Sequence, residues 1–149
     1  YELNVYRRLR NTYFDQLMLE IRSKRGGECV EKDVLLRHMV QMRSDGRLPI
    51  YGMLCDQKPS PRNAHVWTTF LNQETAILNG AEVLSKKFGY PCFYAHISSP
   101  KRGYYTVTFV AMLSEHLTEE YARLLEQNIL EQPHLWLWTH NRWKYKRPQ

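Results

Sequence analysis

Long hydrophobic runs are missing from this sequence of 149 residues, whose longest unbroken apolar stretch is residues 109–113. A membrane-spanning helix needs about 18 apolar residues or more, so the sequence predicts no such span. Hydrophobic residues still make up 43% of the chain. A chain of this length can bury roughly two thirds of its unfolded surface, which predicts one soluble globular domain and excludes a disordered tail.

Cysteine is also scarce. The three cysteines, Cys29, Cys55 and Cys92, are 26 and 37 positions apart. No close pair suggests a zinc site, and the odd number argues against a disulfide framework. We therefore expect no metal or other cofactor, and a reducing compartment.

Basic residues outnumber acidic residues at both ends of the chain. The first 25 residues hold six basic and three acidic side chains, residues 26–139 hold eleven and twelve, and the last ten hold four and none. If the two ends meet, they form one positive surface suited to phosphate groups, anionic lipid or an acidic protein. A solvated face and a loose basic tail explain the same charges, and charge alone favours that alternative.

Apolar side chains at helical spacing predict four helices. The predicted helices cover residues 13–21, 31–44, 77–88 and 118–131. Asn11 or Thr12 is expected to cap the first helix and Thr118 the fourth, and Gly89 is expected to end the third.

Extended segments are predicted between these helices, at residues 1–6, 48–54, 66–71, 92–97 and 104–113. The segment 48–54 is apolar without alternation, which is typical of a buried strand. The last two segments are joined by a turn at 98–103 and should pair antiparallel. Strands alternating with helices predict an α/β fold, a mixed sheet flanked by helices, in a single domain over residues 1–149.

Two segments hold residues that could carry chemistry. Asp56-Gln57 follows a predicted strand and opens a loop with two prolines, the place where α/β proteins position binding residues; a simple turn is the alternative. Residues 135–144 hold three of the four tryptophans beside His140, Arg142 and Lys144. Such a mixture suits a lipid or phosphate surface, and the alternative is a final strand whose tryptophans cover the core.

The run from Pro133 to Lys144 resembles the C-terminal signature of bacterial lipid A biosynthesis acyltransferases, a proline followed by an aromatic-Leu-Trp-x-His-x-Arg-Trp/Phe-Lys segment. Further pieces match in the same order: Tyr6-Arg7 followed by Asn11, then Arg22 and Arg25 before Gly26, then Asp56-Gln57. The resemblance covers nearly the whole chain. One departure is Phe70-Leu71-Asn72, where family members often have Phe-x-Gly.

This resemblance implies a membrane-associated transferase at the cytoplasmic face of the bacterial inner membrane, with a glycerol-phosphate-acyltransferase-like fold. Such an enzyme moves a fatty acyl group from acyl carrier protein, or a similar thioester, to a hydroxyl of a phosphorylated glucosamine lipid. The matched residues implied to bind substrate or shape the site are Arg7, Asn11, Arg22, Arg25, Asp56, Gln57, His140, Arg142 and Lys144. For Asn11 a helix cap is the stronger interpretation, and for His140 a structural histidine.

Family members use a His-x4-Asp/Glu dyad, in which the histidine deprotonates the attacking hydroxyl and the carboxylate orients the imidazolium. Five positions after the six histidines stand Arg43, Phe70, Lys101, Tyr121, Thr139 and Tyr145, none of them acidic. We therefore expect the dyad, and a hydrophobic anchor, upstream of Tyr1 in a parent protein. The fold would then be incomplete at its N-terminus, and the present chain should be a soluble fragment with little or no activity.

Three other functions stay open on the sequence. A glycerol-phosphate or lysophospholipid acyltransferase would share the dyad and the broad fold. A basic α/β module could bind nucleic acid through its aromatic, arginine and lysine side chains, although no RNA-binding motif is present. A peripheral membrane-binding domain would need no chemistry.

Overall fold

The computed structural model describes residues 2–147, which form an α/β structure of two compact units that divide between Leu54 and Cys55. The predicted α/β class is confirmed. The strands lie in three small sheets, one parallel and two antiparallel. None of the described helices has the length and the apolar character that crossing a membrane requires.

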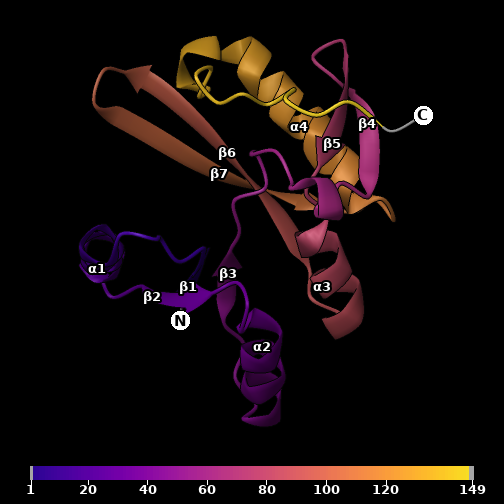
Figure 1. Cartoon of the computed structure of the whole chain (residues 1–149). Helices are drawn as coiled ribbons and strands as arrows, with labels where there is room; N and C mark the ends of the chain where they lie inside the picture. The colour runs from indigo at the N-terminus through magenta and orange to yellow at the C-terminus, as the bar shows by residue number, and fades with distance from the viewer. Residues whose placement is uncertain (1, 148–149) are drawn as a thin grey trace. The chain divides into compact units, whose positions relative to one another are not determined.

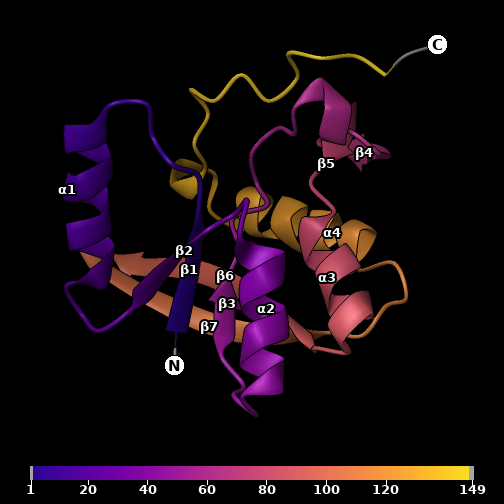
Figure 2. The same cartoon turned by 60° about the horizontal axis from the view of Figure 1, so that its bottom comes forward.

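The first unit is a parallel sheet with two crossover helices (Figure 2). Its elements are β1 (Glu2–Tyr6), α1 (Thr12–Ser23), β2 (Glu28–Glu31), α2 (Leu35–Ser44) and β3 (Ile50–Gly52). The strand order is β2-β1-β3, so β1 is the central strand and the connection from β2 to β3 passes over it. Parallel strands bring the carboxyl ends of β1 and β3 to one edge, where open α/β sheets bind ligands.

Asn11 caps α1, as predicted, because its side-chain oxygen accepts a hydrogen bond from the backbone N–H of Phe14. The second predicted helix is wrong at its start, since residues 28–31 form β2 and α2 begins at Leu35. The predicted strand 48–54 is shorter than expected and not buried: Ile50 is 70% exposed. β3 pairs with β1 alone, so as an edge strand it does not have the cover that the apolar run suggested.

The second unit follows from residue 55 (Figure 1). Its elements are η1 (Pro61–Asn63), β4 (Val66–Phe70), β5 (Gln73–Ile77), α3 (Gly80–Phe88), β6 (Cys92–Lys101), β7 (Tyr104–Met112), α4 (Leu117–Glu131) and η2 (Pro133–Leu135). α4 packs against both antiparallel pairs, contacting β4 and β6. The core consists of Phe70, Ile77, Ala122 and Ile129, with Leu71, Tyr121, Leu125, Trp136 and Trp143 packed around it.

Strand β5 was missed in the sequence because an unusual turn precedes it. Leu71 and Asn72 both have positive φ, 49° and 59°, as the central residues of a two-residue hairpin turn require. Leucine rarely adopts this conformation, so the sequence carries no turn signal there. The backbone N–H of Leu71 donates to Glu126 Oε1 at 2.7 Å, and its side chain packs on the core. These contacts offset the strain.

Three further boundaries differ from the sequence prediction. Because β5 uses residues 73–77, α3 starts at Gly80, although it ends at Gly89 as predicted. The N-cap of α4 is His116 rather than Thr118, which lies in the first turn. β6 continues to Lys101, so the predicted turn at 98–103 tightens to Arg102-Gly103, and the predicted antiparallel pairing is confirmed.

The C-terminal tryptophans do not lie on a strand, since residues 136–147 have no strand assignment. Trp136 and Trp143 pack against the core. The expectation that Trp138 also covers the core is wrong: it is 55% exposed, and its indole N–H donates to the carbonyl of Pro133 at 2.7 Å.

Candidate functional site

The predicted site residues fall into two groups, four in the first unit and five in the second. In the first unit, the loop from β1 to α1 carries Arg7, Arg8 and Arg10; we call residues 7–10 the arginine loop. Its backbone is fixed by α1, because the N–H of Leu9 donates to Oδ1 of Asp15 at 2.8 Å. Asp15 is buried, and it also pairs with Arg8 at 3.9 Å.

Arg7 and Arg10 are exposed, and no ion pair holds either one within residues 2–147. Guanidinium groups bind phosphate oxygens through several donors at once. The arginine loop also follows the carboxyl end of β1, next to that of β3. It is therefore chemically suited to an anionic ligand.

The two other arginines of this unit lie at the far end of α1. Arg22 is half-buried, with its guanidinium 5.8 Å from the centre of the Tyr6 ring. Arg25 is exposed in the turn after the helix, beside Gly26, whose φ of 86° requires glycine. The contact with Tyr6 explains Arg22 as a packing residue, whereas Arg25 is available to a ligand.

In the second unit, the C-terminal segment contacts the loop that begins at Asp56. The backbone N–H of Lys58 donates to Nε2 of His140 at 3.1 Å. Asp56 is half-buried, and Gln57 is exposed. The structure thus brings the loop of Asp56 and His140 together although 84 positions separate these two residues.

Arg142 is the most buried of the predicted site residues, at 4% exposure. Its Nη2 donates to the carbonyl of Ala76 on β5 at 2.6 Å, while Nε and Nη1 have no partner. Burial lowers the pKa of Arg142, and the charges of Tyr121 and Asp56 oppose that effect. A buried guanidinium is costly unless an anion faces it, and Asp56 is the carboxylate near enough to act on it.

Three neighbouring groups show the same electrostatic influence of Asp56. Burial raises the pKa of Tyr121 far above its usual value, and negative charge at Asp56 adds to that effect. Burial chiefly raises the pKa of Tyr94 to about 12 and that of Cys55 to about 11. The phenols and the thiol therefore stay protonated at neutral pH, and Cys55 is a small buried side chain.

Lys144 points to a different surface. It is exposed, its ammonium lies 5.7 Å from the centre of the Tyr145 ring, and it lines a hollow with Pro61, Ala64, Trp67, Tyr145 and Lys146. Cationic and aromatic side chains in one hollow can receive an anionic group.

Tyr121 and Lys58 were not predicted as site residues. Tyr121 sits on α4 in a pattern that reads as ordinary core packing, and Lys58 takes part through its backbone N–H. Only the fold places them beside Asp56. Residues 2–147 contain no group of three or more histidine, cysteine, aspartate or glutamate side chains that could hold a metal ion.

Comparison with known proteins completes the description of the site. A family model described as "Bacterial lipid A biosynthesis acyltransferase" matches residues 3–145. That range includes every predicted site residue. Among curated proteins, none matches the chain.

Proposed function

The chain belongs to the bacterial lipid A biosynthesis acyltransferase family, and from this we propose that it recognises a phosphorylated glucosamine lipid in an enzyme that acylates it. The donor would be acyl carrier protein or a similar acyl thioester, and the acceptor a hydroxyl of the lipid. The family match over residues 3–145 is the observation that carries the proposal.

The exposed cations are the groups we assign to the acceptor phosphates. Arg7, Arg10 and Arg25 are free of ion pairs within residues 2–147, and Lys144 lines a hollow. Charge-assisted hydrogen bonds from such groups are about twice as strong as neutral ones. Arg22 is left out of this set because it packs on Tyr6, and Asn11 because it caps α1.

Asp56 and Gln57 are the groups we assign to the sugar. A carboxylate and an amide oxygen accept hydrogen bonds from hydroxyl groups. Both residues lie in the loop that opens the second unit, which His140 holds at the backbone of Lys58. Acceptor binding by these residues does not itself move a proton or an acyl group.

Binding to the acceptor tests the proposal without requiring turnover. Equilibrium binding of the chain to micelles with a phosphorylated glucosamine lipid should exceed binding to the dephosphorylated lipid by about tenfold, the value of one charge-assisted contact. Arg7→Gln should lose most of that preference. Arg37→Gln, at an exposed position on α2, is the matched control.

Equal affinity for the two lipids would contradict the proposal. Stronger, salt-sensitive binding to an oligonucleotide would favour a nucleic-acid-binding module instead.

An acyl-transfer assay examines the catalytic part of the proposal. No histidine of this sequence is followed by a carboxylate five positions later, so general-base catalysis by the family dyad has no candidate here. We expect little or no transfer from acyl carrier protein by the chain alone. Turnover close to that of a family member that has the dyad would show that other residues perform the chemistry.

A further inference from the structure

The segment from His140 to Trp143 makes three hydrogen bonds to distant parts of the second unit. His140 accepts from the backbone of Lys58, Arg142 donates to the carbonyl of Ala76, and Trp143 donates to the hydroxyl of Thr75 at 2.8 Å. These partners are 82, 66 and 68 positions away. The segment therefore ties the loop of Asp56 to strand β5.

The side chains of His140 and Arg142 bond to other parts of the same chain. Arg142 is 4% exposed, and the Nε2 atom of His140 is occupied by Lys58. A headgroup at the surface could not reach the buried guanidinium without displacing its neighbours. This burial distinguishes Arg142 from Lys144, which is exposed.

The charges around Arg142 point to Asp56. Two nitrogens of the guanidinium lack partners, and leaving buried donors unpaired is unfavourable. Among the carboxylates of residues 2–147, Asp56 is the one whose charge acts on Arg142, and it also acts on Tyr121, Tyr94 and Cys55. The hydrogen bond from Lys58 to His140 at 3.1 Å also holds the loop of Asp56 beside the segment that carries Arg142.

We propose that His140 and Arg142 are positioning residues, which hold the Asp56 carboxylate in place: His140 fixes the loop backbone at Lys58, and Arg142 supplies the facing positive charge. This inference rests on the proposed function only in taking Asp56 as the ligand-contacting residue. The family-like segment would then act through Asp56 rather than touch the lipid itself.

Nuclear magnetic resonance of the whole chain tests the backbone contact. Because Nε2 of His140 accepts a hydrogen bond, the imidazole should carry its proton on Nδ1, and ring ¹⁵N shifts report that tautomer directly. His140→Phe should speed hydrogen exchange at the Lys58 amide by about tenfold or more while leaving core amides protected. His140→Gln, which retains an acceptor, should restore part of the protection.

His134→Phe is the matched control, since His134 is exposed and lies six positions earlier. It should leave the Lys58 amide unchanged. A His140 ring protonated on Nε2, or an unchanged Lys58 exchange rate in His140→Phe, would overturn the contact.

Substitutions of Arg142 and of Asp56 test the charge interaction between these two residues. Arg142→Met should shift the side-chain ¹³C resonance of Asp56, and Arg142→Lys should shift it less because the positive charge stays. Trp143→Phe, which removes the neighbouring bond to Thr75, should leave that resonance in place. If Arg142→Met does not fold, Asp56→Asn should shift the Nε–H resonance of Arg142.

If the Nε–H resonance of Arg142 does not shift in Asp56→Asn, the assignment of the facing charge is overturned. These readouts do not involve lipid, so they separate this inference from the proposed function. The exchange rate of Lys58 and the resonance of Asp56 could respond as expected while the chain shows no preference for the phosphorylated lipid. That combination would support the positioning contacts and contradict the proposed ligand.

Discussion

Glu82 on α3 supplies the side-chain cap that α4 lacks at its own N-terminus. His116, the N-cap residue, makes no capping bond, whereas Oε2 of Glu82 accepts from the backbone N–H of Thr118 at 2.8 Å and from its hydroxyl at 2.5 Å. A negative charge at this end of a helix is also favoured by the helix dipole. Thr118, which the sequence predicts as the N-cap, therefore donates its backbone N–H and its hydroxyl to Glu82.

The pH dependence of this contact can be predicted. Burial by itself would raise the pKa of Glu82, but hydrogen bonds from Lys86 and Thr118 outweigh it and lower the pKa below the usual 4.5. A carboxyl group with a lowered folded-state pKa stabilises the fold above its unfolded pKa, and that stability is lost as pH falls through the folded value.

Glu82→Gln should accordingly lower the free energy of unfolding by about 1 kcal/mol at pH 7, the usual value of a helix cap. The difference from the wild type should shrink in urea titrations below pH 4.5, where the wild-type carboxyl becomes protonated. Glu119→Gln removes an exposed charge from the first turn of α4, next to Thr118, and serves as the comparison. A difference independent of pH would contradict the role of the charge.

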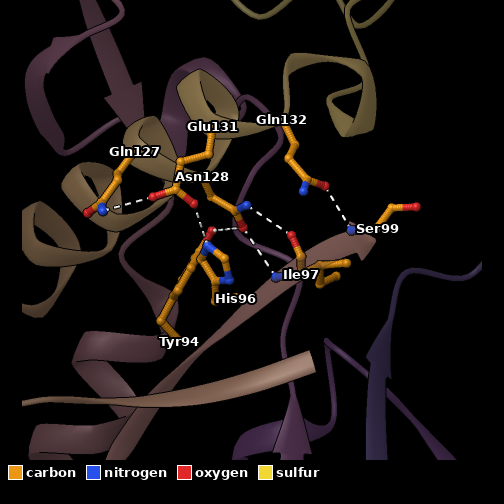
Figure 3. A network of polar contacts seen from close by, with 8 residues as sticks. All are labelled: Tyr94, His96, Ile97, Ser99, Gln127, Asn128, Glu131 and Gln132. Carbon is orange, nitrogen blue, oxygen red and sulfur yellow. Dashed lines mark hydrogen bonds and ion pairs between the residues drawn. The ribbon is translucent and has the colours of Figure 1, made fainter. Parts of the chain in front are cut away.

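The β6–β7 hairpin is held to α4 on one face by a row of polar side chains (Figure 3). The Asn128 side chain accepts from the N–H of Ile97 at 3.2 Å and from the hydroxyl of Tyr94 at 3.0 Å, and it donates to the carbonyl of Ile97 at 2.9 Å. Gln132 accepts from the N–H of Ser99, and Glu131 pairs with His96. Asn128 thus gives β6 backbone bonds that a further strand would otherwise supply.

Asn128→Ala should destabilise the second unit by about 1–2 kcal/mol, because these partly exposed hydrogen bonds are worth roughly 0.5–1.5 kcal/mol each. Amide exchange in β6 should increase along with the loss of stability. The control is Gln127→Ala: among the residues that the structure describes, the Gln127 side chain bonds to Glu131 of its own helix and not to β6. Equal effects of the two variants would mean that Asn128 does not anchor the hairpin.

The opposite face of this hairpin is apolar and uncovered in the described structure. Phe93, Ile97, Val107 and Phe109 lie on it in register, and Phe109 is 71% exposed. Exposed apolar faces and open strand edges promote association. Sedimentation velocity should therefore detect concentration-dependent self-association of the chain, and Phe109→Lys should reduce it.

Thr106→Lys adds the same charge on the other face of β7 and should change the association less. A chain that stays monomeric at all concentrations would contradict this prediction.

At the scale of the whole molecule, the formal net charge of +6 predicts electrostatic attraction to anionic surfaces. Binding to vesicles containing an anionic phospholipid should weaken from 0.05 to 0.5 M salt, since the screening length falls from roughly 14 to 4 Å. Replacing Lys144 and Lys146 by serine should weaken it further, by about 1 kcal/mol per charge. Lys87→Ser, at an exposed position on α3, provides a comparison for a single lost charge. Salt-insensitive binding would point to apolar contacts instead.

Local signals fixed much of the secondary structure in advance. The cap at Asn11, the glycine stop at Gly89 and the extended segment 104–113 depend on residues near in sequence, and the structure confirms α1, the end of α3 and β7. The secondary-structure predictions were wrong where a contact with a residue distant in sequence determines the local backbone conformation. Leu71 accepts a positive φ because Glu126 and the core hold it, and α4 starts at Leu117 with a cap from Glu82.

The sequence by itself determined the α/β class, most helix and strand positions, and the family, because these depend on periodicity and on motifs that are contiguous or ordered along the chain. Only the tertiary structure decided that the His140–Trp143 segment faces inward. Burial of Arg142 and the contact of His140 with Lys58 join residues 66 and 82 positions apart to their partners, and no local pattern encodes such pairings. The same arginine that the sequence suggests as a surface cation is, in the fold, a buried side chain that donates to the carbonyl of Ala76.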